Sequence, residues 1–234
     1  MDEMSLKVAI TQSNYIPWKG FFDSIKLVDV FVLYDDMQYT KRDWRNRNMI
    51  KSQNGTQWLS IPVEVKGKYF QKISETKISD PAWGNQHWQT LKHTYGKLPG
   101  FALYKDIFEE IYHHDYTYLS EVNYAFIKVI CSILNIKTEI RWSHEFELPE
   151  GKTERLVHIT KALGGTDYFT GPAAKNYMDE RLFEEENIQV HYYDYSGYPE
   201  YEQRFPPFTH GVSILDLLFT VGKDAKQFMK FFDE

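Results

Sequence analysis

Two adjacent carboxylates are followed by a run of cationic and amide side chains in the first quarter of the chain. Asp35 and Asp36 come directly after an apolar segment at 30–34. A carboxylate can take a proton from an amine, and guanidinium groups bind phosphate through paired hydrogen bonds. The candidate substrate-binding residues that follow are Gln38, Lys41, Arg42, Arg45, Asn46, Arg47 and Asn48. The pattern predicts an anion site beside Asp35 and Asp36, which are catalytic candidates.

Both features also have an ordinary structural interpretation. Aspartates often turn the chain at the end of a strand, and a charge run is often a solvated face with surface ion pairs. Trp44, Asn46 and Asn48 are interleaved with the cations. This mixture favours ligand binding over a purely solvated face.

A polar turn after the first apolar segment supplies further candidates. Residues 6–10 are apolar, and Gln12, Asn14, Tyr15 and Trp18 follow them. Such side chains suit a sugar or the carboxyl group of an amino acid, although they could equally bond the backbone of the turn itself. Open α/β sheets bind ligands beyond the carboxyl ends of their strands. We therefore expect the ends of the first two strands to converge on one pocket.

The later candidates are Thr170, Gly171, Lys175 and His210. Thr170 and Gly171 end an apolar segment, and Lys175 could meet an anion where a helix starts. An ordinary strand-to-helix turn explains the same residues. His210 lies in a loop with proline and glycine, and histidine can act as a general base near neutral pH. The alternative is a surface histidine with no chemical role.

The sequence indicates neither a metal site nor a nucleophile. None of the eight histidines stands at a recognised metal-ligand spacing, and CxxC is absent. Cys131 lies in the apolar run 126–134, so we expect an inert core thiol. GxSxG is also absent. We predict no metal, and direct transfer rather than a covalent intermediate.

The candidate residues require an α/β scaffold to position them. The spacing of apolar residues predicts strands at 6–10, 30–34, 138–142, 167–170 and 188–193, and helices at 17–27, 153–163, 174–186 and 213–219. A β-hairpin is predicted from 57–65 and 71–78. Helices at 81–95, 99–112 and 118–134 would form a helical subdomain at about 80–136. We expect one domain over 1–234, with a mainly parallel sheet flanked by helices and with the hairpin and helical subdomain inserted in the middle.

The composition limits the partners. Net charge is −6, which disfavours nucleic acid, and no apolar run approaches the ~18 residues of a membrane span. Aromatic residues make up 17% of the chain, and rings with polar tips suit sugars and nucleotides. One cysteine cannot form an internal disulfide, so we expect a reducing, cytoplasmic setting.

Taken together, motifs over nearly the whole chain resemble the signature of the WbqC-like proteins. The early part comprises Gln12, Tyr15, Pro17, Trp18, Gly20, Asp35, Asp36, Gln38, Tyr39, Lys41, Asn46, Arg47 and Asn48. The later part comprises Tyr168, Phe169, Thr170, Gly171, Tyr177, Tyr193, Tyr201, Gln203, Phe205, Pro207, Ser213, Ile214, Leu215 and Asp216. Ser13 is a departure, since the family often has proline after the glutamine.

The resemblance implies a role in the biosynthesis of bacterial O-antigen or other surface polysaccharides, for which glycine transfer to an amino sugar has been suggested. We expect acyl or aminoacyl transfer to a nucleotide-linked amino sugar, with an activated acyl donor or ATP. One alternative is an ATP-dependent amide-forming or nucleotidyl-transferring enzyme of HUP-like type, although its HxGH motif is missing. Another is a non-catalytic accessory protein that binds sugar nucleotides.

Overall fold

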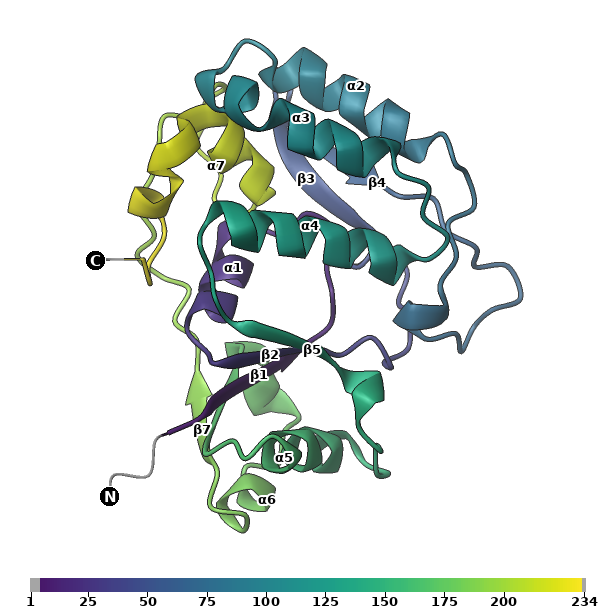
Figure 1. Cartoon of the computed structure of the whole chain (residues 1–234), viewed down its shortest axis with the longest axis vertical. Coiled ribbons are helices and arrows are strands. Elements are labelled where there is room, and N and C mark those ends of the chain that lie inside the picture. Colours follow the sequence, from purple (N-terminus) through teal and green to yellow (C-terminus); the bar gives the residue numbers. More distant parts are fainter. Residues whose placement is uncertain (1–4, 233–234) are drawn as a thin grey trace.

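Five parallel strands form the central sheet of the protein (Figure 1). The structure is a computed structural model that describes residues 5–232, so the first four and last two residues of the predicted domain lie outside the described residues. The spatial order is β5 (Glu139–Trp142), β2 (Val30–Leu33), β1 (Lys7–Thr11), β6 (Asp167–Thr170) and β7 (Gln189–Tyr192). The predicted mainly parallel α/β sheet is confirmed.

Both faces of the sheet are buried, which explains why its strands are apolar runs. Successive side chains of a strand point to opposite faces. Ala9 and Phe31 therefore pack into a large core on one face, and Val8 and Val30 pack into a smaller core on the other. The register pairs Val8 with Val30 of β2 and with Tyr168 of β6.

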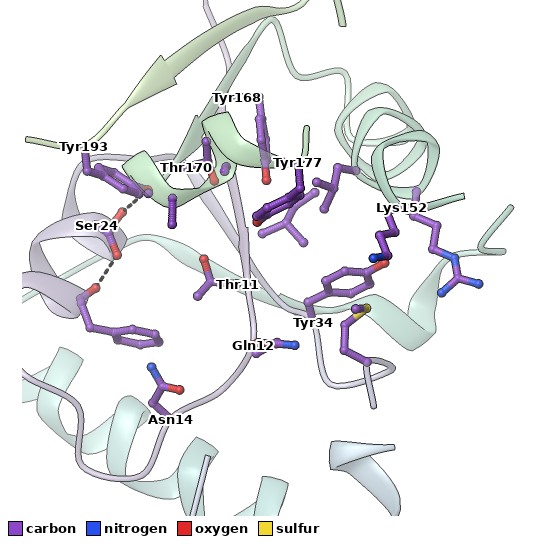
Figure 2. Close-up of a pocket in the computed structure, with 18 of the residues that line it drawn as sticks. Thr11, Gln12, Asn14, Ser24, Tyr34, Lys152, Tyr168, Thr170, Tyr177 and Tyr193 are labelled. Atoms are coloured by element: carbon purple, nitrogen blue, oxygen red, sulfur yellow. Dashed lines mark hydrogen bonds between the residues drawn. The ribbon is translucent and has the colours of Figure 1, made fainter. Parts of the chain in front are cut away.

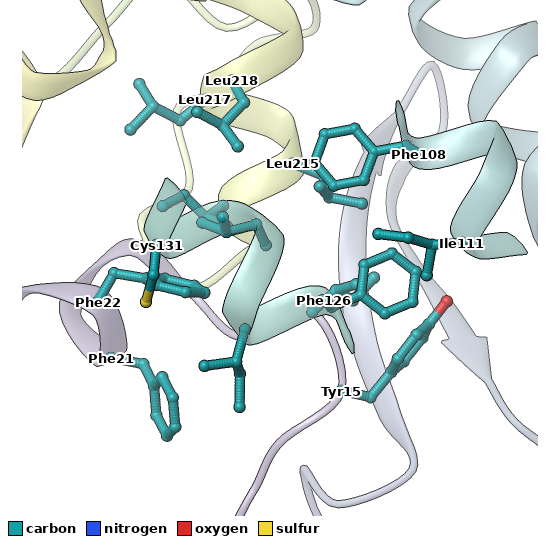
Figure 3. Packing of buried hydrophobic residues seen from close by; sticks show 14 of the residues in the cluster. Tyr15, Phe21, Phe22, Phe108, Ile111, Phe126, Cys131, Leu215, Leu217 and Leu218 are labelled. Atoms are coloured by element: carbon teal, nitrogen blue, oxygen red, sulfur yellow. The ribbon is translucent and has the colours of Figure 1, made fainter. Parts of the chain in front are cut away.

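Helices cover the two faces unequally (Figure 1). The larger core contains α1 (Lys19–Lys26), α2 (Trp83–Tyr95), α3 (Pro99–His113), α4 (Leu119–Ile133) and α7 (Ile214–Val221). The smaller core contains α5 (Lys152–Ala162) and α6 (Arg181–Glu184). Figure 3 shows Phe22 of α1, Phe126 of α4 and Leu215 of α7 in the same packed layer. The helical insertion is therefore joined to the sheet through one continuous apolar core.

The β-hairpin was predicted at the wrong place. It is formed by β3 (Arg47–Ser52) and β4 (Gly55–Ser60), not by 57–65 and 71–78. The turn consists of Gln53 and Asn54, and Gly55, which pairs with Ser52, has a φ of 106° that glycine adopts without strain. Pro62 has no N–H with which to continue the second strand. In place of a second strand, the 71–78 segment contains a 3₁₀ turn and isolated bridges, such as Val63 with Ile78.

The remaining elements differ from expectation in detail. The helix predicted at 174–186 is two pieces, the 3₁₀ turn Pro172–Asn176 and α6. Further 3₁₀ turns cover Ile73–Glu75, Ser143–Glu145 and Gly222–Phe228. Among the described residues, no helix is both long and apolar enough to cross a bilayer.

The order of the strands creates a switch point between β1 and β6. After β1 the chain adds β2 and β5 on one side, and it then returns to add β6 and β7 on the other side. The loops that leave β1 and β6 consequently diverge at their carboxyl ends. Open α/β sheets bind ligands in the crevice that this divergence leaves.

Candidate functional site

A cavity of about 750 Å³ lies at this carboxyl edge of the sheet (Figure 2). Its walls come from the ends of β1, β2 and β6, from α1 and from the start of α5. The volume is in the range of small-molecule sites. The cavity is therefore the candidate functional site.

Seven of the predicted site residues line this cavity. They are Gln12, Asn14, Trp18, Asp36, Gln38, Thr170 and Gly171. They belong to the segments that follow β1, β2 and β6, so residues far apart in sequence meet at one edge of the sheet. Figure 2 shows Gln12, Asn14 and Thr170 around the same space.

Asp36 is the carboxylate that lines the cavity among the described residues. Its Oδ2 accepts a hydrogen bond from Ser143 Oγ at 2.6 Å, and its Oδ1 accepts one from Lys72 Nζ at 3.0 Å. Desolvation opposes its charge, but these two hydrogen bonds outweigh it and hold the pKa of Asp36 below its usual value. Asp36 is therefore ionised at neutral pH and suited to bind a cationic or hydrogen-bond-donating group.

Asp35, although adjacent in sequence, is buried and does not line the cavity. Its carboxylate accepts hydrogen bonds from Ser13 N at 2.8 Å, Ser13 Oγ at 2.7 Å and Ser120 Oγ at 2.5 Å. Burial raises its pKa, and the hydrogen bonds from Ser120 and Ser13 offset part of the rise. Asp35 thus ties the turn after β1 to α4.

The cation-rich segment 41–48, called here the arginine segment, lies beside the turn after β1 but outside the cavity wall. Arg45 donates to Asn14 Oδ1 and lies 3.6 Å from the Asp43 carboxylate. Asn48 donates to the Tyr15 carbonyl at 3.1 Å, and Asn46 donates to that of Ile61 at 2.8 Å. These side chains hold the backbone in place.

The other cations of the arginine segment also lie away from the cavity. Arg47 donates to the carbonyl of Arg42, and its guanidinium carbon lies 4.1 Å from the ring centre of Trp58. Lys41 and Arg42 are exposed. Arg45 and Arg47 thus each donate to an oxygen of the protein itself, and none of the four cations of the arginine segment lines the cavity.

Three further candidates are placed elsewhere. The Tyr15 hydroxyl is buried 2.8 Å from His87 Nδ1 and 2.9 Å from the Tyr112 hydroxyl. Lys175 Nζ lies 4.5 Å from the ring centre of Tyr192. His210 is exposed and packs against Phe208, and desolvation followed by the charge of Lys19 lowers its pKa. None of the three lines the cavity.

Sequence reasoning overlooked the two cations that do line the cavity, Lys152 and Arg155. Both belong to the first turns of α5, which follows β5 through a loop. The available signal was Gly151-Lys152-Thr153 directly before a predicted helix. Glycine followed by lysine at a helix start is a recurrent arrangement around anions.

An aromatic wall completes the cavity. Tyr34, Tyr168, Tyr177, Tyr193 and Tyr195 line it together with Trp18. The ring centres of Trp18 and Tyr195 are 5.3 Å apart, and those of Tyr193 and Tyr195 are 5.7 Å apart. Flat rings with polar tips can stack on a sugar or base and still form hydrogen bonds.

Comparison with known proteins identifies the family. The family model described as "WbqC-like protein family" matches residues 12–228. The chain belongs to the WbqC-like family. A relative of this chain, "Uncharacterized protein Rv1507c" of Mycobacterium tuberculosis, is 48% identical over 226 residues, which cover 96% of this chain and 98% of the relative. No solved structure matches this WbqC-like chain significantly.

The WbqC-like signature residues divide between the cavity and buried supports. In the later motifs, Thr170 and Tyr193 line the cavity, whereas Asp216 is fully buried. Asp216 accepts hydrogen bonds from the hydroxyls of Tyr95 at 2.7 Å and Tyr201 at 2.6 Å. This part of the signature thus holds α7 against its neighbours.

The described residues form no cluster of side chains that is typical of a metal-binding site. Across 5–232, no three side chains of His, Cys, Asp or Glu come together as a metal-binding group. The chemistry visible at the cavity is a carboxylate, two cations, amides and phenols. This arrangement can bind a ligand that carries both an amine and an anion.

Proposed function

We propose that this protein is a transferase of bacterial surface-polysaccharide biosynthesis that moves an acyl or aminoacyl group, with glycine as a candidate, onto a nucleotide-linked amino sugar. The observation that carries the proposal is the cavity at the switch point, which combines ionised Asp36 with an aromatic wall. The carboxylate suits the amine of the sugar, and the rings suit the sugar and the base.

In the proposed reaction, Asp36 accepts a hydrogen bond from the sugar amine and orients it towards the acyl carbon. A new bond forms between the amine nitrogen and the acyl carbon, while the bond from that carbon to the donor's leaving group breaks. The amine proton leaves with the departing group or through water. Because the pKa of Asp36 is lowered, its carboxylate is better suited to positioning the amine than to acting as the base that accepts its proton.

The test is product formation. The purified protein is incubated with nucleotide-linked amino sugars, glycine, ATP and acyl thioesters, and the sugars are analysed by mass spectrometry. An acyl or glycyl mass gain is expected. Asp36→Asn should lower turnover about 10- to 100-fold, because a charge-assisted hydrogen bond is lost. Asp106→Asn, an exposed position on α3, is the matched control and should leave turnover unchanged.

A second candidate function uses ATP to activate the acyl group. The specific observation that favours it is the sheet order, in which the chain's first strand is central and the sheet grows from it in both directions, as in nucleotide-binding α/β folds. Release of AMP or pyrophosphate with product would select this route. Tight binding of sugar nucleotide without any product would instead select the non-catalytic accessory role and reject transfer.

We propose the cytoplasm as the setting. Cys131, the single cysteine of the chain, is buried, and burial raises the pKa of its thiol to about 12. A thiol held protonated in the core is unreactive and forms no internal disulfide. This chemistry is compatible with a reducing compartment.

A further inference from the structure

The two cations at the start of α5 line the cavity, and neither forms an ion pair among the described residues. Within residues 5–232, Lys152 makes no hydrogen bond or ion pair, and its side chain lies at the cavity edge (Figure 2). Arg155 Nε donates to the Pro149 carbonyl at 2.8 Å. That bond fixes the plane of the guanidinium, whose terminal nitrogens have no carboxylate partner within the same described residues and lie near the Tyr34 hydroxyl.

A buried hydroxyl at the same place lacks a partner. Tyr34 is 7% exposed and lines the cavity, and its hydroxyl forms no hydrogen bond of good geometry among the described residues, although the Arg155 guanidinium lies beside it. Buried hydroxyls are normally paired, because leaving one unpaired costs about 1–3 kcal/mol. Burial raises the pKa of Tyr34 and the neighbouring Arg155 opposes part of the rise. The phenol therefore stays protonated and can donate to a ligand oxygen.

The backbone at the start of α5 adds donors of the same kind. Gly151 caps this 11-residue helix and supplies no side-chain hydrogen bond, so the N–H groups of the first turn keep their donor capacity. Helix N-termini favour anions. Glu154 opposes this, since its carboxylate lies over Gly151, but it lines a separate depression with His158 and Lys161 rather than the main cavity.

We infer that Lys152, Arg155, the Tyr34 hydroxyl and the first turn of α5 form a diphosphate subsite. This inference rests on the proposed function, and it names the part of the substrate that the α5 end of the cavity binds. Asp36, Tyr34 and Arg155 all line the same cavity, so a carboxylate and a cation are available to one ligand. This combination suits an amino sugar that carries both an amine and a diphosphate.

Titration calorimetry with UDP, uridine, ATP and inorganic pyrophosphate tests the subsite. Lys152→Met and Arg155→Met should each raise the Kd for UDP about tenfold and leave that for uridine unchanged, because only the phosphate contacts are lost. Lys161→Met is the matched control, since Lys161 lies on the same helix but pairs with Glu186. Its UDP affinity should equal that of the wild type.

Tyr34→Phe separates ligand binding from folding. Removing an unpaired buried hydroxyl should leave the protein as stable as the wild type or more so, while the Kd for UDP rises about three- to tenfold. An unchanged Kd for UDP in a folded Lys152→Met/Arg155→Met double variant would overturn the subsite. So would a wild-type protein that binds none of UDP, ATP or pyrophosphate at about 10 mM.

The ligand series also separates this inference from the proposed function. UDP binding that depends on Lys152 and Arg155, without acyl transfer to any sugar, would leave the subsite standing and reject the transferase. Equal dependence of UDP and ATP on both residues supports a general diphosphate site. Product formation that is indifferent to Lys152 and Arg155 would leave the transferase standing and reject the subsite.

Discussion

The arginine segment and the start of α5 are both cationic, yet they do different things. In the arginine segment, Arg45 and Arg47 donate to other residues of the protein. At the start of α5, Lys152 and Arg155 line the cavity and have no carboxylate partner within the described residues. The denser cluster in the sequence is the one whose inner charges are already used.

The density of cationic residues along the sequence is therefore a weak guide to a ligand site. A cation is available to a ligand only if the folded protein leaves it unpaired and accessible. Arg45 is largely buried beside Asn14, and Asp35 and Tyr15 pair with further buried groups in the same region. These residues should therefore govern stability, whereas those of α5 should govern binding.

The largest expected effect is a loss of stability, and it should differ between the two neighbouring aspartates. Asp35→Ala should lower the free energy of unfolding by about 3–5 kcal/mol, because three buried donors on Ser13 and Ser120 lose their acceptor. Asp36→Ala should cost about 1–2 kcal/mol, since it removes one acceptor from the buried Ser143 hydroxyl and an ion pair with the half-exposed Lys72. Urea denaturation measures both values. Equal losses in the two variants would contradict the division between support and site.

Two arginine variants, one in the arginine segment and one in α5, test the same difference between the two regions. Arg45→Ala should lower the free energy of unfolding by about 2 kcal/mol, because the Asn14 side-chain oxygen and the Asp43 carboxylate both lose a donor. Arg155→Ala should change it by no more than about 0.5 kcal/mol. The measurement is again urea denaturation, with UDP titration alongside. A stable Arg45→Ala variant with impaired UDP binding would reverse our assignment of the two regions.

The pH dependence of stability tests the buried side of the comparison through His87. Burial lowers the pKa of His87, whose Nδ1 lies beside the Tyr15 hydroxyl, to about 4. In the unfolded chain His87 takes up a proton near pH 6.5, whereas in the folded protein it does so only near pH 4. The stability is therefore full above pH 6.5 and falls as the pH drops towards 4. The loss between pH 7 and pH 5 is about 2 kcal/mol.

His87→Gln should remove most of that slope, as measured by urea denaturation at the two pH values. The control is His158→Gln, an exposed position on α5, which should keep the wild-type slope. The same slope in His87→Gln and wild type would show that the interior beneath the turn after β1 is open to water.

The elements that could be predicted were those with a strong local signal. β1 and β2 are short runs of β-branched and aromatic residues, and their burial on both faces is the reason for that pattern. The hairpin could also have been found, because Asn54-Gly55 is a local signal. The split of 174–186 into two short pieces had no comparable signal.

Only part of the site could be predicted, for a reason of geometry. Gln12 and Asp36 lie within three residues of strand ends and Thr170 ends a strand, so the rule that ligands bind beyond strand ends leads to them. Lys152 and Arg155 lie on a helix after a loop, and their distance from Tyr34 depends on how α5 packs on the sheet.

The amino-acid sequence by itself determined the α/β class, the family and the segments that end at the carboxyl edge, since apolar periodicity and motifs are local properties. The tertiary structure decided which polar groups are paired. Asp35 and Asp36 are adjacent in the chain, but one is enclosed by Ser13 and Ser120 while the other lines the cavity. Pairing depends on partners that are distant in sequence, and these meet only when the core has packed.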